Sequence, residues 1–257
     1  MKYVGKIAVT DQTERKNAIL AVLDGIGIPY EIHDTVRDEQ PVSNIIVSLN
    51  PSSHRLVIGS HWDNVDGSTG ANDNASSCSI LLRLCETLKN TDRSVDLVFF
   101  DKEEKGCLGS CAYIDETGRE NISAMVNLDV CGAGKQIVIW SKGNVDNSSF
   151  HGILASANLE KHGVTDLPWL PYGDDRSFDA AGIPNITVCV LEPDDLAVFR
   201  TVSARIAASQ TLSDEEISAF HGVKVLTTMH NGVNDSISSV NPDVLDDVFA
   251  FFSDGLK

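Results

Sequence analysis

Apolar runs of strand length alternate along this chain with segments of helical period, and this alternation limits the fold more than any other feature. It is the pattern expected of a mostly parallel sheet covered by helices on both faces. A chain of 257 residues with 42% hydrophobic residues can bury a large core in one such domain. We therefore expect a single α/β domain over residues 1–257, with a mixed, mostly parallel twisted sheet flanked by helices.

Five segments have the length and composition of strands, and the nearly continuous apolar run at 95–100 is typical of a strand covered on both faces. The predicted strands are residues 44–49, 55–60, 95–100, 124–128 and 184–191. Asn50, Pro51 and the two serines that follow favour a chain reversal between the first two strands.

Helical periodicity and capping residues predict the helices. Asp11 with Glu14 resembles a capping box for a helix over about 12–25 that stops at Gly25 or Gly27. A second helix follows Asn74, so that Asp73 lies at its N-terminus. Further helices are predicted over about 146–162, in two stretches between 194 and 220, and after the Asn-Pro pair at 241–242.

Composition excludes several classes of protein. The formal net charge of −17 argues against binding nucleic acid, which depends on clustered Lys and Arg. Six cysteines without a Cys-x-x-Cys pair favour reduced, mostly buried thiols. The N-terminus lacks the apolar core of a signal peptide, and no run of about 18 apolar residues occurs. We expect a cytoplasmic protein without a membrane partner.

Five residues that can bind a metal ion each close a short apolar run: His61, Asp73, Glu104, Asp129 and His230. Imidazole and carboxylate are the side chains that hold catalytic divalent metals. Any one of them alone could be an ordinary hydrogen-bonded residue or a helix cap. Together they fall beyond the carboxyl ends of predicted strands, where open α/β sheets place their active sites.

The segments HWD, GANDNAS, DKEEKGCLGS and NLDVCG resemble successive motifs of metallopeptidase family 28, the group of bacterial leucyl aminopeptidases with two co-catalytic zinc ions. The later stretch GDDRSFDAAGIP is similar to that family's segment S-D-H-x-x-F-x-x-x-G-I-P. The resemblance runs from about residue 44 to residue 245 and implies a zinc aminopeptidase or phosphorylase/hydrolase-like fold.

The resemblance also implies a set of metal ligands. His61 and Asp129 would bind one zinc, Glu104 and His230 the other, and Asp73 would bridge the two. Cobalt or manganese could occupy such a site as well. Each ion would keep room for water or substrate, as a catalytic zinc requires.

Two further carboxylates receive roles by the same resemblance. Glu103 would be the general base that takes a proton from a metal-bound water, the nucleophile. Asp63 would accept the second N–H of the His61 imidazole and fix its tautomer.

The last ligand motif departs from the family pattern. Asp235 lies five residues after His230, whereas the family places the aspartate four residues after the histidine. The other downstream histidines are His151, His162 and His221, in or beside predicted helices, and we retain His230.

Two other residues invite a catalytic interpretation. Tyr172 aligns poorly with the tyrosine that stabilises the oxyanion in some relatives, which favours an ordinary surface turn residue. Cys107 lies near the acidic pair, but no histidine is placed as its base, so we expect a packing role.

The resemblance predicts hydrolysis of N-terminal residues from peptides with a free N-terminus. Apolar first residues are the default, although the negative charge could favour cationic peptides by electrostatic steering. The alternatives are a single-zinc glutaminyl cyclase, a non-catalytic binding homologue, and a two-zinc carboxypeptidase or deacylase that would need Arg176 or Arg200 to hold a carboxylate.

Overall fold

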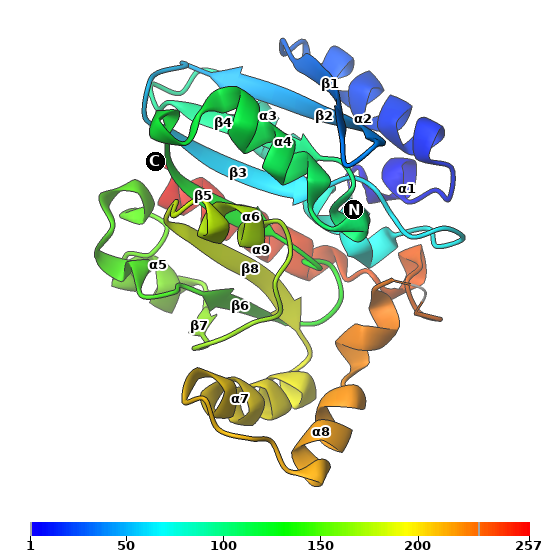
Figure 1. Cartoon of the computed structure of the whole chain (residues 1–257), viewed down its shortest axis with the longest axis vertical. Coiled ribbons are helices and arrows are strands. Elements are labelled where there is room, and N and C mark those ends of the chain that lie inside the picture. The colour runs from blue at the N-terminus through cyan, green and yellow to red at the C-terminus, as the bar shows by residue number, and fades with distance from the viewer. Residues whose placement is uncertain (1, 231) are drawn as a thin grey trace.

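The computed structural model describes residues 2–230 and 232–257 and contains an eight-stranded sheet with helices on both faces (Figure 1). In chain order the strands are β1 (Glu31–Arg37), β2 (Gln40–Leu49), β3 (Arg55–His61), β4 (Val95–Phe100), β5 (Ile122–Leu128), β6 (Gln136–Trp140), β7 (Thr165–Asp166) and β8 (Asn185–Leu191). All five predicted strands are present. Three strands were not predicted: β1, whose polar and largely exposed sequence carries no apolar run, the short apolar strand β6, and the two-residue strand β7.

The strand order is β1-β2-β4-β3-β5-β8-β6-β7. The central strands β4, β3, β5 and β8 are parallel, whereas β2 pairs antiparallel with β4 and β6 pairs antiparallel with β8. This mixed sheet confirms the predicted fold class. The turn after β2 reverses the chain as expected, but β4 lies between β2 and β3, so the two strands do not form a hairpin.

The α-helices of the described residues are α1 (Val4–Ile7), α2 (Gln12–Ile26), α3 (Ser77–Leu88), α4 (Leu108–Thr117), α5 (Ser156–Lys161), α6 (Asp175–Ala180), α7 (Pro193–Ala207), α8 (Asp214–His221) and α9 (Pro242–Gly255). Helices α3 and α9 pack together on one face of the sheet, and α4 and α6 pack on the other. Helices α7 and α8 form a lobe beyond β6 and β8 (Figure 1).

Local signals set several helix ends. The Asp11 carboxylate accepts the backbone N–H of Glu14 at 2.8 Å, and α2 ends at Gly27, whose φ of 69° is left-handed. Asn241 caps α9 by accepting the N–H of Asp243. The sequence therefore predicted both helices within a residue or two.

The predicted helix over 146–162 is wrong, because only α5 is α-helical there and two single 3-10 turns precede it. The Asn147 side chain accepts the N–H of Ser149, a local bond that competes with helix propagation. Gly152 then passes so close to α9 that an added Cβ would lie 2.0 Å from the carbonyl oxygen of Gly255. Tertiary packing thus overrides the periodicity of this segment.

The apolar core is divided by the sheet. The largest cluster lies between the sheet and α2, α3 and α9, and a smaller one fills the side under α4 and α6 around Phe100, Tyr113 and Phe178. All six cysteines lie in the described residues and are free thiols, five of them buried. Within residues 2–230 and 232–257, no helix combines the length and apolar character needed to cross a bilayer.

Candidate metal centre

The candidate site lies at the carboxyl ends of the central parallel strands. The chain leaves β3 through α3 to reach β4 on one side, and then crosses through α4 to β5 on the other side of β3. This change of direction is a topological switch point, where open α/β sheets leave a crevice for ligands. His61 ends β3, Glu103 and Glu104 follow β4, and Asp129 follows β5.

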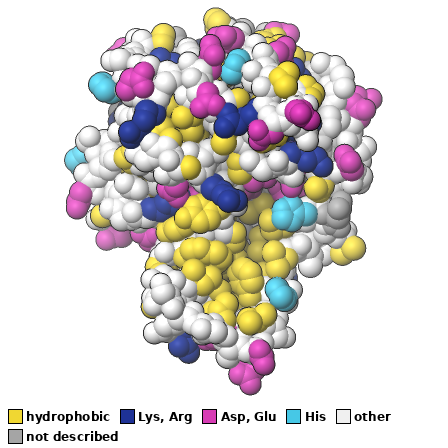
Figure 2. Space-filling view, in the orientation of Figure 1, with side chains coloured by type: hydrophobic (Ala, Val, Ile, Leu, Met, Phe, Trp, Pro, Cys, Tyr) yellow, Lys and Arg dark blue, Asp and Glu magenta, His cyan; other side chains and the backbone are white. Residues whose placement is uncertain are grey.

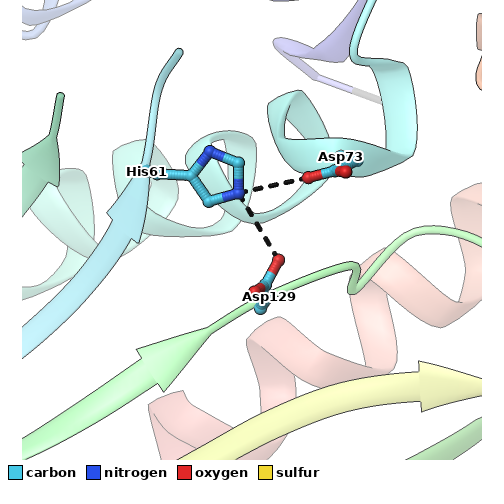
Figure 3. A group of neighbouring side chains, drawn as sticks. All are labelled: His61, Asp73 and Asp129. Atoms are coloured by element: carbon cyan, nitrogen blue, oxygen red, sulfur yellow. Dashed lines mark ion pairs between the residues drawn. The ribbon is translucent and has the colours of Figure 1, made fainter. Parts of the chain in front are cut away.

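His61, Asp73 and Asp129 form the first group of possible ligands (Figure 3). Nε2 of His61 lies 3.1 Å from Oδ1 of Asp73 and 3.6 Å from Oδ1 of Asp129. Figure 3 shows the three side chains pointing toward one another from β3, from the turn before α3 and from the end of β5. His61 and Asp73 are buried, and Asp129 is partly exposed.

Asp73, Glu104 and His230 form a second group, so that Asp73 belongs to both, and His61, Glu103 and Glu104 form a third. Nε2 of His230 lies 3.7 Å from Oε2 of Glu104. The backbone N–H of His230 donates to Oδ2 of Asp73 at 2.8 Å. Within each group the possible ligand atoms lie within 4.8 Å of one another. The structure therefore brings together all five residues that the sequence singled out.

Asp73 does not begin a regular helix as predicted. It lies in a π-helical turn over Ala71–Ser76, where its φ of −111° and ψ of 84° are not helical, and the regular helix α3 begins at Ser77. This turn is fully buried, so its shape is set by surrounding contacts rather than by helix propensity.

The extra residue before Asp235 does not displace His230 from the cluster. Oδ1 of Asp235 accepts the backbone N–H of Asn72 at 2.8 Å, and its Oδ2 accepts the Ser68 hydroxyl at 2.7 Å. These bonds join the segment after His230 to the loop that precedes Asp73. The alternative histidines lie elsewhere: His151 and His221 are exposed, and His162 lies 2.9 Å from Asp254.

Asp63 links the first histidine to the acidic pair. Its Oδ1 lies 3.4 Å from Nδ1 of His61, and its main-chain carbonyl oxygen lies 3.2 Å from the same nitrogen. The same carboxylate accepts the backbone N–H of Glu103 at 3.0 Å and that of Glu104 at 3.2 Å. This second contact was not predicted, because no sequence pattern reports a bond to a backbone 40 residues away.

The acidic residues carry more negative charge than their neighbours can balance. Burial, followed by repulsion from Asp73, raises the pKa of Glu104 to about 8. Burial also raises the pKa of Glu103 well above its ordinary value, although the His61 charge opposes this. The pKa of His61 is well above its ordinary value, because hydrogen bonds to Asp129, Asp63 and Asp73 outweigh the lowering by burial.

A bound cation would relieve this imbalance. Oε1 of Glu104 is buried and has no hydrogen-bond partner among the described residues, as expected of an oxygen reserved for a ligand. Imidazole and carboxylate donors of this kind suit zinc, cobalt or manganese. The donor set thus fits a divalent metal.

Asp174 is a buried residue of the site to which the sequence assigned no role. Neither of its carboxylate oxygens has a hydrogen-bond partner within the described part of the chain. Burial raises its pKa to about 7, and its charge in turn raises the pKa of Glu103. The signal was present in the Asp-Asp pair that replaces the family's Asp-His in that segment.

Cys107 lacks the surroundings of a catalytic group, whereas Tyr172 lines a cavity beside Asp129 and His230. Tyr172 is 52% exposed, and its ring packs edge-on against Trp140 with centroids 5.2 Å apart. Cys107 is buried, donates to the carbonyl of Gly173 at 3.3 Å, and has its thiol pKa raised by burial. A protonated thiol is a poor nucleophile, which agrees with the packing role expected of Cys107.

A cavity of about 260 Å³ opens beside Asp129 and His230. Its other walls are mainly apolar and come from β8, α7, α8 and the segment that precedes His230, with Leu191, Phe199 and Phe220 among them. Figure 2 shows hydrophobic side chains gathered in the hollow between the α7–α8 lobe and the sheet. Arg176 and Arg200 are exposed and lie outside the set that lines this cavity.

The chain is similar in sequence to curated aminopeptidases. Aminopeptidase YwaD of Bacillus subtilis is 31% identical over 112 residues, which are 40% of this chain and 24% of that protein. The chain spans between 12% and 41% of the length of the first curated relatives that it matches.

Two solved structures share the fold. BSAP, a zinc aminopeptidase from Bacillus subtilis, aligns with a TM-score of 0.61 at 21% identity over 85% of this chain and 50% of that chain. Porphyromonas gingivalis glutaminyl cyclase aligns with a TM-score of 0.71 at 20% identity, and the alignment covers 99% of this chain and 95% of that chain. Residues 44–252 match the sequence model of peptidase family M28. Spanning most of the chain, this match shows that the protein belongs to peptidase family M28.

Proposed function

We propose that this protein is a metal-dependent aminopeptidase that uses two co-catalytic metal ions, zinc by preference, to remove N-terminal residues from peptides. One observation carries the proposal: of the three groups of possible ligands among the described residues, two share the carboxylate of Asp73. Family membership supports peptide hydrolysis, and the names of several relatives support the aminopeptidase activity.

In this proposal His61 and Asp129 would hold one ion, Glu104 and His230 would hold the other, and Asp73 would contribute to both. Bound together, two such ions polarise the scissile carbonyl and lower the pKa of water. The shared position of Asp73 supports a pair of ions, because its two oxygens face the two groups separately: Oδ1 faces His61, and Oδ2 accepts the His230 amide.

Glu103 would be the general base. Its backbone N–H is held by Asp63, and burial raises its pKa above the ordinary value, which makes the carboxylate a stronger base than a solvated glutamate. The carboxylate would take the proton of the attacking water and then deliver it to the leaving amine. Its Oε1 lies 3.8 Å from Sγ of Cys107.

The apolar cavity supports a preference for apolar first residues over cationic ones. Its walls are mainly hydrophobic, and its charged members, Asp129 and His230, belong to the proposed metal centre. A basic side chain would therefore lose hydration without gaining a free carboxylate partner inside the cavity. This observation weighs against the cationic-peptide hypothesis raised by the net charge.

Metal stoichiometry and substrate screening test the proposal together. Zinc-loaded protein should contain two ions per chain by elemental analysis and should hydrolyse leucine and phenylalanine p-nitroanilides faster than lysine p-nitroanilide at low salt. Protein that holds zinc yet hydrolyses none of these amides would contradict the aminopeptidase assignment.

A glutaminyl cyclase activity is the second candidate, favoured by the near-complete overlap of this chain with a solved glutaminyl cyclase. It predicts one metal ion per chain and release of ammonia from peptides that begin with glutamine, without hydrolysis of leucine amides. The same preparation, assayed with both substrates, separates the two activities.

A further inference from the structure

Arg15 is a charged side chain that lies completely inside the protein, with an exposed fraction of 0%. Among the described residues, none of its nitrogens forms an ion pair with a carboxylate; the guanidinium donates instead to four backbone carbonyls. Burying a guanidinium is costly unless its donors are satisfied, so such an arrangement calls for an explanation.

Three of the four carbonyls belong to the loop that joins the first two proposed ligands, His61 and Asp73. Nε donates to Trp62 at 2.5 Å, Nη1 to Thr69 at 2.8 Å and Nη2 to Gly70 at 3.0 Å. Trp62 directly follows His61, and Gly70 lies three residues before Asp73. One rigid group therefore ties together the two ends of this loop.

The neighbouring turn of α2 holds the middle of the same loop. Nε2 of Gln12 donates to the carbonyl of Asn64 at 2.7 Å. Gln12 and Arg15 are three residues apart and so lie on the same face of the helix. The remaining Arg15 bond, from Nη1 to Ile7 at 3.2 Å, anchors the guanidinium to α1.

The loop is shaped closely around the guanidinium. Gly70 has a left-handed φ of 52°, and an added Cβ would lie 2.9 Å from Nη1 of Arg15 and 2.5 Å from the carbonyl oxygen of Asp73. The turn that enters Asp73 thus packs directly on the arginine. A displacement of the guanidinium would move the backbone that carries the proposed bridging ligand.

We propose that Arg15 is a positioning residue for the metal centre: its planar fork fixes the loop 62–70, and thereby sets the separation of His61 and Asp73. Arg15 and Gln12 precede the segment that matches the family, so α2 acts as a brace supplied from outside that segment. Metal sites need ligands held within about 0.5 Å of the productive geometry, which a flexible loop alone does not provide. The inference rests on the proposed metal site.

The test compares Arg15→Lys with Asn158→Ala. Lysine keeps the positive charge but lacks the planar set of N–H donors of the guanidinium. The electrostatic attraction is therefore preserved while the hydrogen bonds to the loop carbonyls are lost. Asn158 is also buried and also donates to two backbone carbonyls, those of Ile153 and Phe251, but these connect α5 to α9 and not the ligand loop. The control variant therefore loses a comparable buried contact elsewhere.

Apo protein of each variant is titrated with Zn²⁺ in competition with a chromophoric chelator, at a temperature where circular dichroism shows all of them folded. We expect Arg15→Lys to bind the tighter Zn²⁺ about tenfold more weakly than the wild type, a loss typical of residues that orient ligands. Asn158→Ala should lower the melting temperature and leave the affinity for Zn²⁺ unchanged.

Equal affinity in Arg15→Lys and wild type, or an equal loss in Asn158→Ala, would overturn the inference and leave the proposed function standing. Wild-type protein that binds no Zn²⁺ would overturn both. If Arg15→Lys does not fold, Gln12→Met carries the test, because it removes one contact to the same loop from a partly exposed position. Unchanged affinity for Zn²⁺ in that variant also contradicts the proposal that α2 positions the loop 62–70.

Discussion

Asp63 accepts a hydrogen bond from the backbone N–H of Glu103 at 3.0 Å, and this bond orients the turn that carries the two adjacent glutamates. The glutamate side chains then have different neighbours. Oε1 of Glu103 lies 3.8 Å from Sγ of Cys107, whereas Oε2 of Glu104 lies 3.7 Å from Nε2 of His230. Both carboxylates lie within 4.8 Å of His61 and of each other, so only these further neighbours distinguish the two chemically identical groups.

The substitution Glu103→Gln should abolish turnover and leave the metal content unchanged. The amide keeps the size of the side chain but accepts no proton from water, and loss of a general base typically lowers kcat by about 10²–10⁴-fold. Elemental analysis and the p-nitroanilide assay measure the two effects. Loss of metal from this variant would show that Glu103, and not Glu104 alone, is a ligand.

The substitution His230→Ala should remove one of two bound ions, because the imidazole lies beside Glu104 in the second ligand group. His221→Ala is the matched control, since that residue is exposed at the end of α8. Zinc per chain after gel filtration should fall from two to about one in the first variant only. Equal zinc content in both variants would argue against His230 as a ligand.

The apparent affinity for zinc should rise with pH and level off above about pH 8. In the metal-free protein, burial raises the pKa of Glu104 to about 8, so a proton must leave before this carboxylate can bind metal. Because the pKa of Glu104 is raised in the folded apo protein, this protein binds more protons than the unfolded chain between about pH 5 and pH 8. The contribution of Glu104 to the stability of the apo protein therefore falls as pH rises from about 5 to about 8.

Chelator competition at pH 6, 7, 8 and 9, with thermal unfolding of the apo protein at the same values, measures both trends. A zinc affinity that does not change between pH 6 and pH 8 would contradict the protonated state of Glu104. His61 acts in the same direction, because its raised pKa also requires a proton to leave before metal binds.

A carboxylate in the apolar cavity should shift substrate preference toward basic residues. Leu226 lines the cavity, and Leu226→Asp would lower kcat/KM for leucine p-nitroanilide by about tenfold or more while raising activity toward lysine p-nitroanilide relative to leucine. Ile217→Asp is the control, because Ile217 lies 40% exposed on α8, outside the cavity. If both variants hydrolyse leucine and lysine p-nitroanilides in the same ratio, the side chain of the substrate's first residue does not bind in this cavity.

Loss of Lys142 should destabilise the protein strongly. Its ammonium lies 2.6 Å from Oδ2 of the fully buried Asp175, so Lys142→Met leaves a buried carboxylate without its cation. Breaking a buried pair in this way costs about 3 kcal/mol in the free energy of unfolding. Lys161→Met removes an exposed lysine from Asp254, and urea unfolding should show a change below about 1 kcal/mol.

The sequence by itself determined the fold class, the central strands and the identities of the candidate ligands. Strands such as β4 are recognisable because they are covered on both faces and therefore need nearly continuous apolar runs. The caps Asp11 and Asn241 mark their helices because each satisfies a nearby backbone N–H. His61, Glu104 and Asp129 were visible because they lie at or just after the ends of buried strands, whereas Asp73 and His230 came from motifs that resemble the family.

Only the tertiary structure decided how these residues meet. Three contacts join segments far apart in the chain. Asp73 belongs to two ligand groups, Asp63 accepts the backbone N–H groups of Glu103 and Glu104, and the buried Arg15 donates to the loop between His61 and Asp73. The predicted helix over 146–162 failed for the same reason, since Gly152 is placed by its contact with α9. Local patterns report local hydrogen bonds and burial, whereas long-range contacts depend on the packing of the whole chain.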